Sequence, residues 1–175
     1  MASTPVTRTV EGDLGMRWSA FSTWEAGRDA GLVDEALRPG AVRRSADPSF
    51  LPVTARERDE DLQLAAIAAT LAVRRHVGRS RVVVGADGRV VERSGTDLRE
   101  VELLVGSGGV IRHGGRQSVQ RVLGAATGVS SEGWQQPEHP RIGVDRDYVL
   151  AAVGLLNVHH PGAAAALAVT LVRDP

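Results

Sequence analysis

The chain has 175 residues, of which 42% are hydrophobic and 24% charged, and its 21 Lys and Arg residues balance 21 Asp and Glu residues. This balance argues against a basic surface for nucleic acid or anionic lipid, and an aromatic content of 3% is too low for stacking single-stranded bases. The absence of cysteine excludes a disulfide framework, Cys-ligated zinc and thiol catalysis.

The N-terminal part of the chain is expected to contain a short strand, a helix and a long loop. Residues 8–13 are typical of a strand or hairpin arm that enters a turn at Gly12, and residues 18–30 of a helix. The segment 31–54 carries three prolines and is predicted to be loop-rich, with one helical turn at 34–37.

Residues 56–76 have the clearest helical pattern in the chain. Apolar residues recur at helical spacing, acidic residues gather at the start and basic residues at the end, and Gly78 follows as the stop. Two short valine-rich runs, 81–84 and 89–92, flank an Asp-Gly turn and predict a β-hairpin.

The central stretch 101–115 joins an apolar strand at 103–105 to a glycine loop, and a helix is expected at 119–126. Such a loop can bind an anion or nucleotide, because glycine lets a ligand approach the backbone. Glycine turns after strands are nevertheless common and mostly structural. The interpretation as a binding loop therefore needs support from the rest of the chain.

The C-terminal part is predicted to be a helical hairpin over 145–173. Its first helix, 148–158, is capped by Asp145 or Asp147 and is apolar nearly all round, so we expect it to be buried. Neither helix is long enough to span a bilayer. The alternation of strands and helices predicts a three-layer α/β fold, with ligands at the carboxyl ends of the strands.

Motifs along nearly the whole chain carry a family resemblance: RTVEGDLGMRWSA at 8–20, RRHVG at 74–78, DLREVELLVGSGGVIRHG at 97–114 and DRDYVLAAVGLL at 145–156. Together they resemble the MutL/GlmL family, whose members are accessory proteins of adenosylcobalamin-dependent glutamate mutase and related mutases. The family belongs to the actin-like ATPase superfamily. The resemblance implies the ribonuclease-H-like second lobe of that fold.

The resemblance also implies a nucleotide site for ATP or ADP with Mg²⁺ in the longer parent protein, with weak or no nucleotide binding by residues 1–175 alone. The stretch 103–114 is similar to the adenosine motif, which would bring Gly106, Ser107, Gly108, Gly109 and Val110 to the nucleotide. Gly12 and Asp13 would border it, and Asp147 would contribute as a minor contact. No catalytic residue and no metal ligand is assigned.

The sequence departs from the family pattern in lacking both phosphate-binding loops. We therefore expect residues 1–175 to form a single incomplete domain, the C-terminal portion of a longer ATPase-like protein, and to be inactive in isolation. Its expected partners are a missing N-terminal lobe and the subunits of a B12-dependent mutase. An unpaired sheet edge would favour self-association. No nucleic acid or membrane partner is expected, and the expected location is the cytoplasm.

Two other functions stay open from the sequence. Sugar-type kinases share the adenosine motif, so the chain could be a lobe of a small-molecule kinase, or a non-catalytic binding module with a decayed site. Ser107 lacks a paired histidine and the spacing of a serine nucleophile. His159 and His160 are adjacent and point in different directions, which makes them a poor metal pair.

Overall fold

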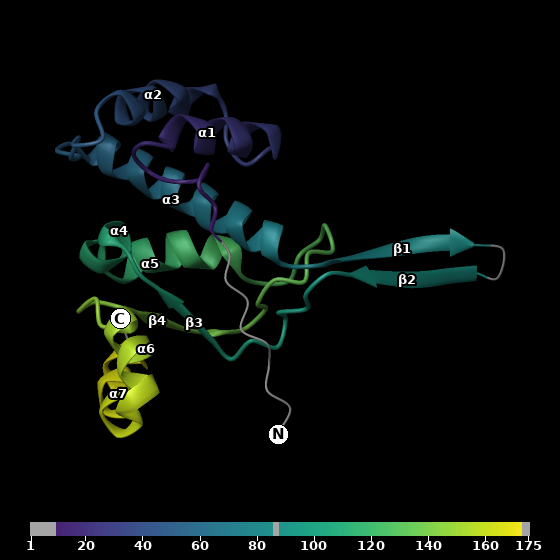
Figure 1. Ribbon diagram of the computed structural model, residues 1–175. Helices are drawn as coiled ribbons and strands as arrows, with labels where there is room; N and C mark the ends of the chain where they lie inside the picture. Colours follow the sequence, from purple (N-terminus) through teal and green to yellow (C-terminus); the bar gives the residue numbers. More distant parts are fainter. Residues whose placement is uncertain (1–9, 86–87, 173–175) are drawn as a thin grey trace.

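The computed structural model describes residues 10–85 and 88–172. Figure 1 shows the arrangement of the elements. In chain order, the elements are α1 (Ala20–Asp29), η1 (Glu35–Leu37), α2 (Arg38–Ala46), α3 (Ala55–His76), β1 (Arg79–Gly85), β2 (Gly88–Ser94), β3 (Leu103–Gly106), α4 (Gly109–His113), α5 (Gly115–Leu123), η2 (Gly124–Ala126), β4 (Arg141–Val144), α6 (Leu150–His159), α7 (Pro161–Ala168) and η3 (Val169–Val172).

The long helix α3 lies between two hydrophobic clusters. On one side it packs against α1 and α2, and on the other against α4 and α5, through a cluster that extends to the β3–β4 sheet (Figure 1). The first cluster contains Ala20, Trp24, Leu37, Ala41, Leu64, Ile67 and Leu71. The second contains Ala65, Ile111, Val119, Val122, Leu123 and Val144. The predicted helix at 56–76 is confirmed, and α3 is the element that the two clusters share.

A capping box begins α3. The Thr54 hydroxyl accepts from Glu57 N at 3.2 Å, and the Glu57 carboxylate accepts from Thr54 N at 2.9 Å and from Val53 N at 3.0 Å. These backbone hydrogen bonds lower the pKa of Glu57 from 4.5 to about 2. The capping box therefore stabilises the ionised form of the Glu57 carboxylate.

We expect the Glu57→Gln variant to lose part of the acid sensitivity of the fold. Because the folded-state pKa is depressed, the contribution of Glu57 is fully present above about pH 4.5 and is lost as the pH falls toward 2. Glutamine can still accept from the backbone but does not titrate, so the variant should show a smaller drop in melting temperature between pH 5 and pH 2, which is the range that these pKa values set. An unchanged pH profile would contradict this assignment. Arg99 also lowers the pKa of the Asp97 carboxyl to about 2. Asp97 titrates in both the unmodified chain and the Glu57→Gln variant, so it does not contribute to the difference between them.

The segment 31–54 contains more helix than the sequence predicted. The helical turn at 34–37 is confirmed as η1, capped by Asp34, whose side chain accepts from Ala36 N. The prediction of loop for the remainder is wrong where α2 forms. Pro39 lies in the first turn of α2, where a proline favours the start of a helix because the missing N–H has no helical partner there.

The strands form two separate two-stranded sheets within the described residues. The predicted hairpin is confirmed as antiparallel β1–β2, while Ala86 and Asp87 of its turn lie outside the described residues. Strand β3 pairs in parallel with β4, a strand that the sequence analysis did not predict. The α/β class holds in this coarse form, with helices and small sheets in alternation.

Two further expectations need correction. Residues 8 and 9 of the expected N-terminal strand lie outside the described part; Val10 and Glu11 form no strand and lead into a turn at Gly12 and Asp13. The helix expected to be buried at 148–158 is α6, which has no buried residue. Its apolar sequence predicts burial, but among the described residues no element covers its outer face. Arg173, at the end of the last predicted helix, lies outside the described residues.

Within the described ranges 10–85 and 88–172, no helix combines the length and the apolar character that crossing a membrane requires.

Candidate functional site

The glycine loop lies at the carboxyl end of β3, beside the carboxyl end of its parallel neighbour β4. Pairing of Gly106 with Val144 brings Ser107 next to Asp145. The Ser107 hydroxyl donates to Asp145 Oδ2 at 3.1 Å, and Asp145 N donates to Gly106 O at 2.9 Å. The two loops that leave these strands are therefore joined to each other. This is the edge of a parallel sheet where ligands usually bind.

Asp145 organises this edge. It is only 2% exposed, and its carboxylate also accepts from Val149 N at 2.7 Å and from Leu150 N at 3.3 Å. It therefore fixes the start of α6 in the way that a capping residue does. Of the two capping residues considered from the sequence, the structure assigns this contact to Asp145. Asp147 is exposed two residues further on.

The glycines of the loop differ in what surrounds them. A Cβ on Gly106 would lie 2.6 Å from Leu123 Cδ1 and 3.0 Å from Ile111 Cδ1, so this glycine allows close packing on the second hydrophobic cluster. Gly108 has a φ of +139°, which L side chains rarely adopt, and a Cβ on Gly108 or Gly109 would meet no atom within 4 Å. The backbone at Gly108 and Gly109 is thus open to an approaching group.

Val110 completes the stretch assigned to the nucleotide. Its half-buried side chain packs against the second hydrophobic cluster. Of its atoms, the backbone is the part left to contact a ligand.

A cation–π pair beside the loop was not predicted. The Arg112 guanidinium of α4 lies 4.6 Å from the centre of the Tyr148 ring, and Arg146 Nη1 donates to Arg112 O at 3.3 Å. Tyr148 has a φ of +53°, a left-handed conformation that is uncommon outside glycine. The pair joins α4 to the loop before α6, and it could have been found only once β3 and β4 were known to be neighbours.

Gly12 and Asp13 occupy a turn at the end of α3. Arg75 Nη1 donates to Glu11 at 2.6 Å, and both Arg75 Nη atoms donate to Asp13 at 2.7 Å. The Arg75 guanidinium holds the pKa of Asp13 below its ordinary value. No hydrogen bond among the described residues joins this turn to the stretch 106–110. The structure thus places the turn on α3, with its carboxylates paired to Arg75.

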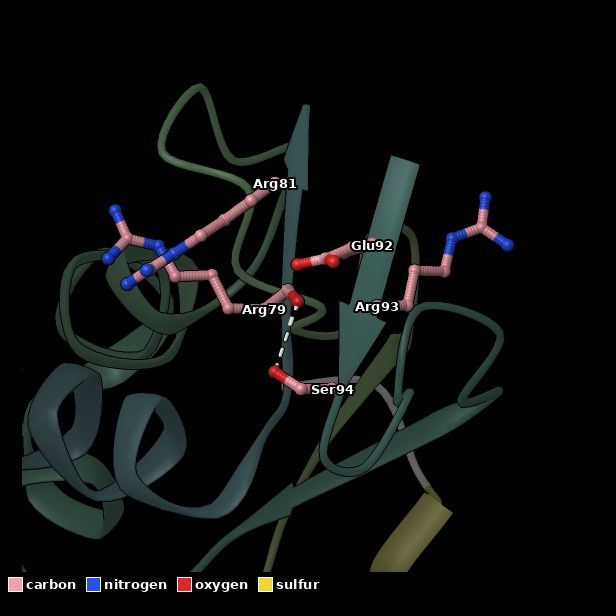
Figure 2. A pocket seen from close by; sticks show the side chains of 5 residues that line it. All are labelled: Arg79, Arg81, Glu92, Arg93 and Ser94. Carbon is pink, nitrogen blue, oxygen red and sulfur yellow. Dashed lines mark hydrogen bonds between the residues drawn. The ribbon is translucent and has the colours of Figure 1, made fainter. Parts of the chain in front are cut away.

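Two shallow hollows lie elsewhere, at the base of the β1–β2 hairpin. One is lined by Arg79, Arg81, Glu92, Arg93 and Ser94, which Figure 2 shows from close by. The other extends to the loop 130–133. In Figure 2 the side chain of Arg93 extends away from those of Arg79 and Arg81. The sequence analysis assigned no role to this region.

Comparisons with known proteins bear on the identity of the chain. The sequence model of the family described as MutL protein matches residues 1–171. Protein MutL of Clostridium tetanomorphum is 34% identical over 156 residues, which cover 85% of this chain and 33% of that protein. The chain thus spans about a third of the length of this curated relative. No solved structure matches. The match over nearly the whole chain and the 34% identity show that the chain belongs to the MutL family.

Proposed function

We propose that this chain is the adenosine-side lobe of an ATP-dependent reactivating factor for a B12-dependent mutase. Two observations support the proposal: membership of the MutL family, and the open backbone at Gly108 and Gly109 beside the carboxyl ends of β3 and β4. In this proposal the lobe has the ribonuclease-H-like fold of actin-like ATPases. It acts in the cytoplasm with the mutase as its client.

The roles of the residues follow from their surroundings. The backbone of Gly108 and Gly109 would lie against the adenosine of ATP or ADP, while Gly106 keeps the loop packed on Leu123. Asp145 would hold the loops after β3 and β4 in register through Ser107. Asp147 is exposed at the same edge and is proposed as a lesser contact.

The energy for releasing damaged cofactor from the client would come from ATP bound with Mg²⁺. We propose that the phosphate-binding groups belong to the part of the full-length protein that corresponds to the remaining length of the relative. The isolated chain should then show no steady ATP hydrolysis. Sustained turnover by the purified chain, lost on changing Gly108→Asp, would contradict this division of roles.

The Gly109→Val variant should lose ADP binding and keep its fold. A Cβ at this position would meet no atom within 4 Å, so a side chain there is expected to obstruct the ligand without disturbing the core. Isothermal titration with ADP would measure the affinity, and circular dichroism would report the helix content.

The matched control is Gly106→Val, whose side chain would collide with Leu123 and Ile111. It should lose stability as well as binding. Equal loss of fold in both variants would show that Gly109 is structural. Saturable ADP binding by the unmodified chain that Gly109→Val leaves unchanged would contradict the nucleotide part of the proposal.

A further inference from the structure

The β1–β2 hairpin projects from the helices as an arm. In Figure 1 it extends beyond the end of α3 with no other described element alongside its outer part. Its base is tied to the loop 130–135 through the Arg79–Trp134 bridge and the hydrogen bond from Ser80 N to Gly133 O at 2.8 Å. All of β2 is exposed, and so are the outer residues of β1. We call residues 79–94 the arm.

The register of the arm assigns its side chains to two faces. Directly paired residues share a face, and successive residues along a strand alternate between faces. The first face carries the pairs Ser80–Arg93, Val82–Val91 and Val84–Arg89. The opposite face carries the pairs Arg79–Ser94, Arg81–Glu92 and Val83–Val90.

The first face combines apolar surface with two arginines. Val82, Val84 and Val91 are 63%, 72% and 55% exposed. Arg89 and Arg93 flank them, the pairs on this face include no carboxylate, and neither arginine forms an ion pair with another described residue. The opposite face is less available, because Arg81 lies across from Glu92 and Arg79 stacks 4.7 Å from the Trp134 ring.

A two-stranded arm of this kind gains little from its own packing. An isolated hairpin is at best marginally stable in water, and exposed valines on such a ribbon favour association. Three valines between two arginines match an apolar protein surface that is bordered by carboxylates. Nucleic acid fits less well, because the valines would face phosphates and the chain has no net charge.

We propose that the first face of the arm, formed by Val82, Val84, Val91, Arg89 and Arg93, is a docking surface for an acidic, apolar-centred patch on the client protein. The proposal rests on the proposed function, in which the client is a B12-dependent mutase. The valines would be covered on binding, and the arginines would meet carboxylates at the border.

The experiment measures binding of the full 175-residue chain to a purified B12-dependent mutase from the same organism. The first test variant is Val82→Ser with Val91→Ser. Its matched control is Val83→Ser with Val90→Ser, the neighbouring cross-strand valine pair on the opposite face. The control carries the same loss of strand propensity and a similar loss of exposed apolar surface. A second test variant, Arg89→Glu with Arg93→Glu, leaves the valines in place and reverses the charge.

The serine test pair should weaken binding about tenfold or more, and the control pair should change it about threefold or less. The charge-reversal pair should weaken binding to a similar extent, with a smaller effect at high salt. Thermal melts would show whether each variant is folded. If only the serine test pair destabilises the chain, its loss of binding is not interpreted. The binding of the charge-reversal pair then tests the docking surface.

Three results would overturn the inference. Equal binding by test and control variants would show that another surface holds the mutase, and the proposed function would stand. Failure of the unmodified chain to bind the mutase would reject the proposed function and the docking surface together. Tight binding to duplex DNA at physiological salt, lost in the arginine variant alone, would identify the arm as a nucleic-acid contact instead.

Discussion

Replacing Arg44 with methionine should lower the free energy of unfolding by about 3 kcal/mol or more. The Arg44 side chain is fully buried between α2 and α3. Its Nε donates to Asp61 at 2.6 Å, one Nη donates to Glu60 and to Gly40 O at 2.9 Å, and the other donates to Glu57 O at 2.7 Å. Methionine fills similar space but donates no hydrogen bond, so each acceptor loses its bond to Arg44 in a buried site.

The expected loss is near the lower end of the range for breaking a buried ion pair, about 3–5 kcal/mol. Asp61 keeps a second partner, Arg17, whose guanidinium lies 3.0 Å away. The matched control is Arg43→Met, one residue earlier in α2. The Arg43 side chain is 58% exposed and pairs with Glu57 at 2.7 Å, and exposed pairs contribute about 0–1 kcal/mol.

Urea unfolding of both variants, followed by circular dichroism, would compare the two free energies. A similar small loss in both would mean that solvent reaches Arg44 or that α2 moves to release it. A large loss confined to Arg44 would establish that the charge network on α3, and not the sequence of α2 itself, keeps 38–46 helical.

This network explains why α2 could not be predicted from the sequence. The segment has two arginines in its last turn, a proline and a glycine near its start, and little apolar character. Local propensity therefore favours a loop, and the tertiary contacts of Arg44 decide otherwise. By contrast, α3 has apolar periodicity, a capping box and charges that complement the helix dipole. All of these signals are local, and its bounds were predicted within one residue at each end.

The candidate site shows the same division between local and long-range information. The glycine loop could be located because an apolar strand, glycines and a helix follow one another directly in the chain. Its partner Asp145 could not be identified, since that contact depends on the pairing of β3 with β4, a four-residue strand containing Gly143. The apolar sequence of α6 likewise predicted a helix, but it did not indicate whether another part of the chain covers that helix.

The exposed faces of α6 and α7 lead to the second large effect, on the oligomeric state. From residue 148 to 172 the chain contains no Asp, Glu, Lys or Arg. α6 has no buried residue and α7 has only Ala164, and in Figure 1 the two helices extend together away from the β3–β4 sheet. An uncharged apolar surface of this kind favours association in water. We expect the isolated chain to self-associate through these helices, whereas the sequence had suggested an open sheet edge as the surface.

Changing Leu155→Lys together with Val158→Lys should convert the self-associated chain to a monomer. These residues lie three apart on one face of α6 and are 78% and 72% exposed, so the lysines enter solvent and should change stability by only about 0.5 kcal/mol. Size-exclusion chromatography with light scattering, at equal chain concentration, would report the mass.

Val129→Lys adds one lysine at another exposed apolar residue, in the loop after η2, and controls for added charge. If the double variant still associates, the contact is formed by the sheet edges of β1–β2 and β3–β4 instead. An unpaired edge offers backbone groups that lysines on α6 do not block. A monomeric unmodified chain would contradict both surfaces.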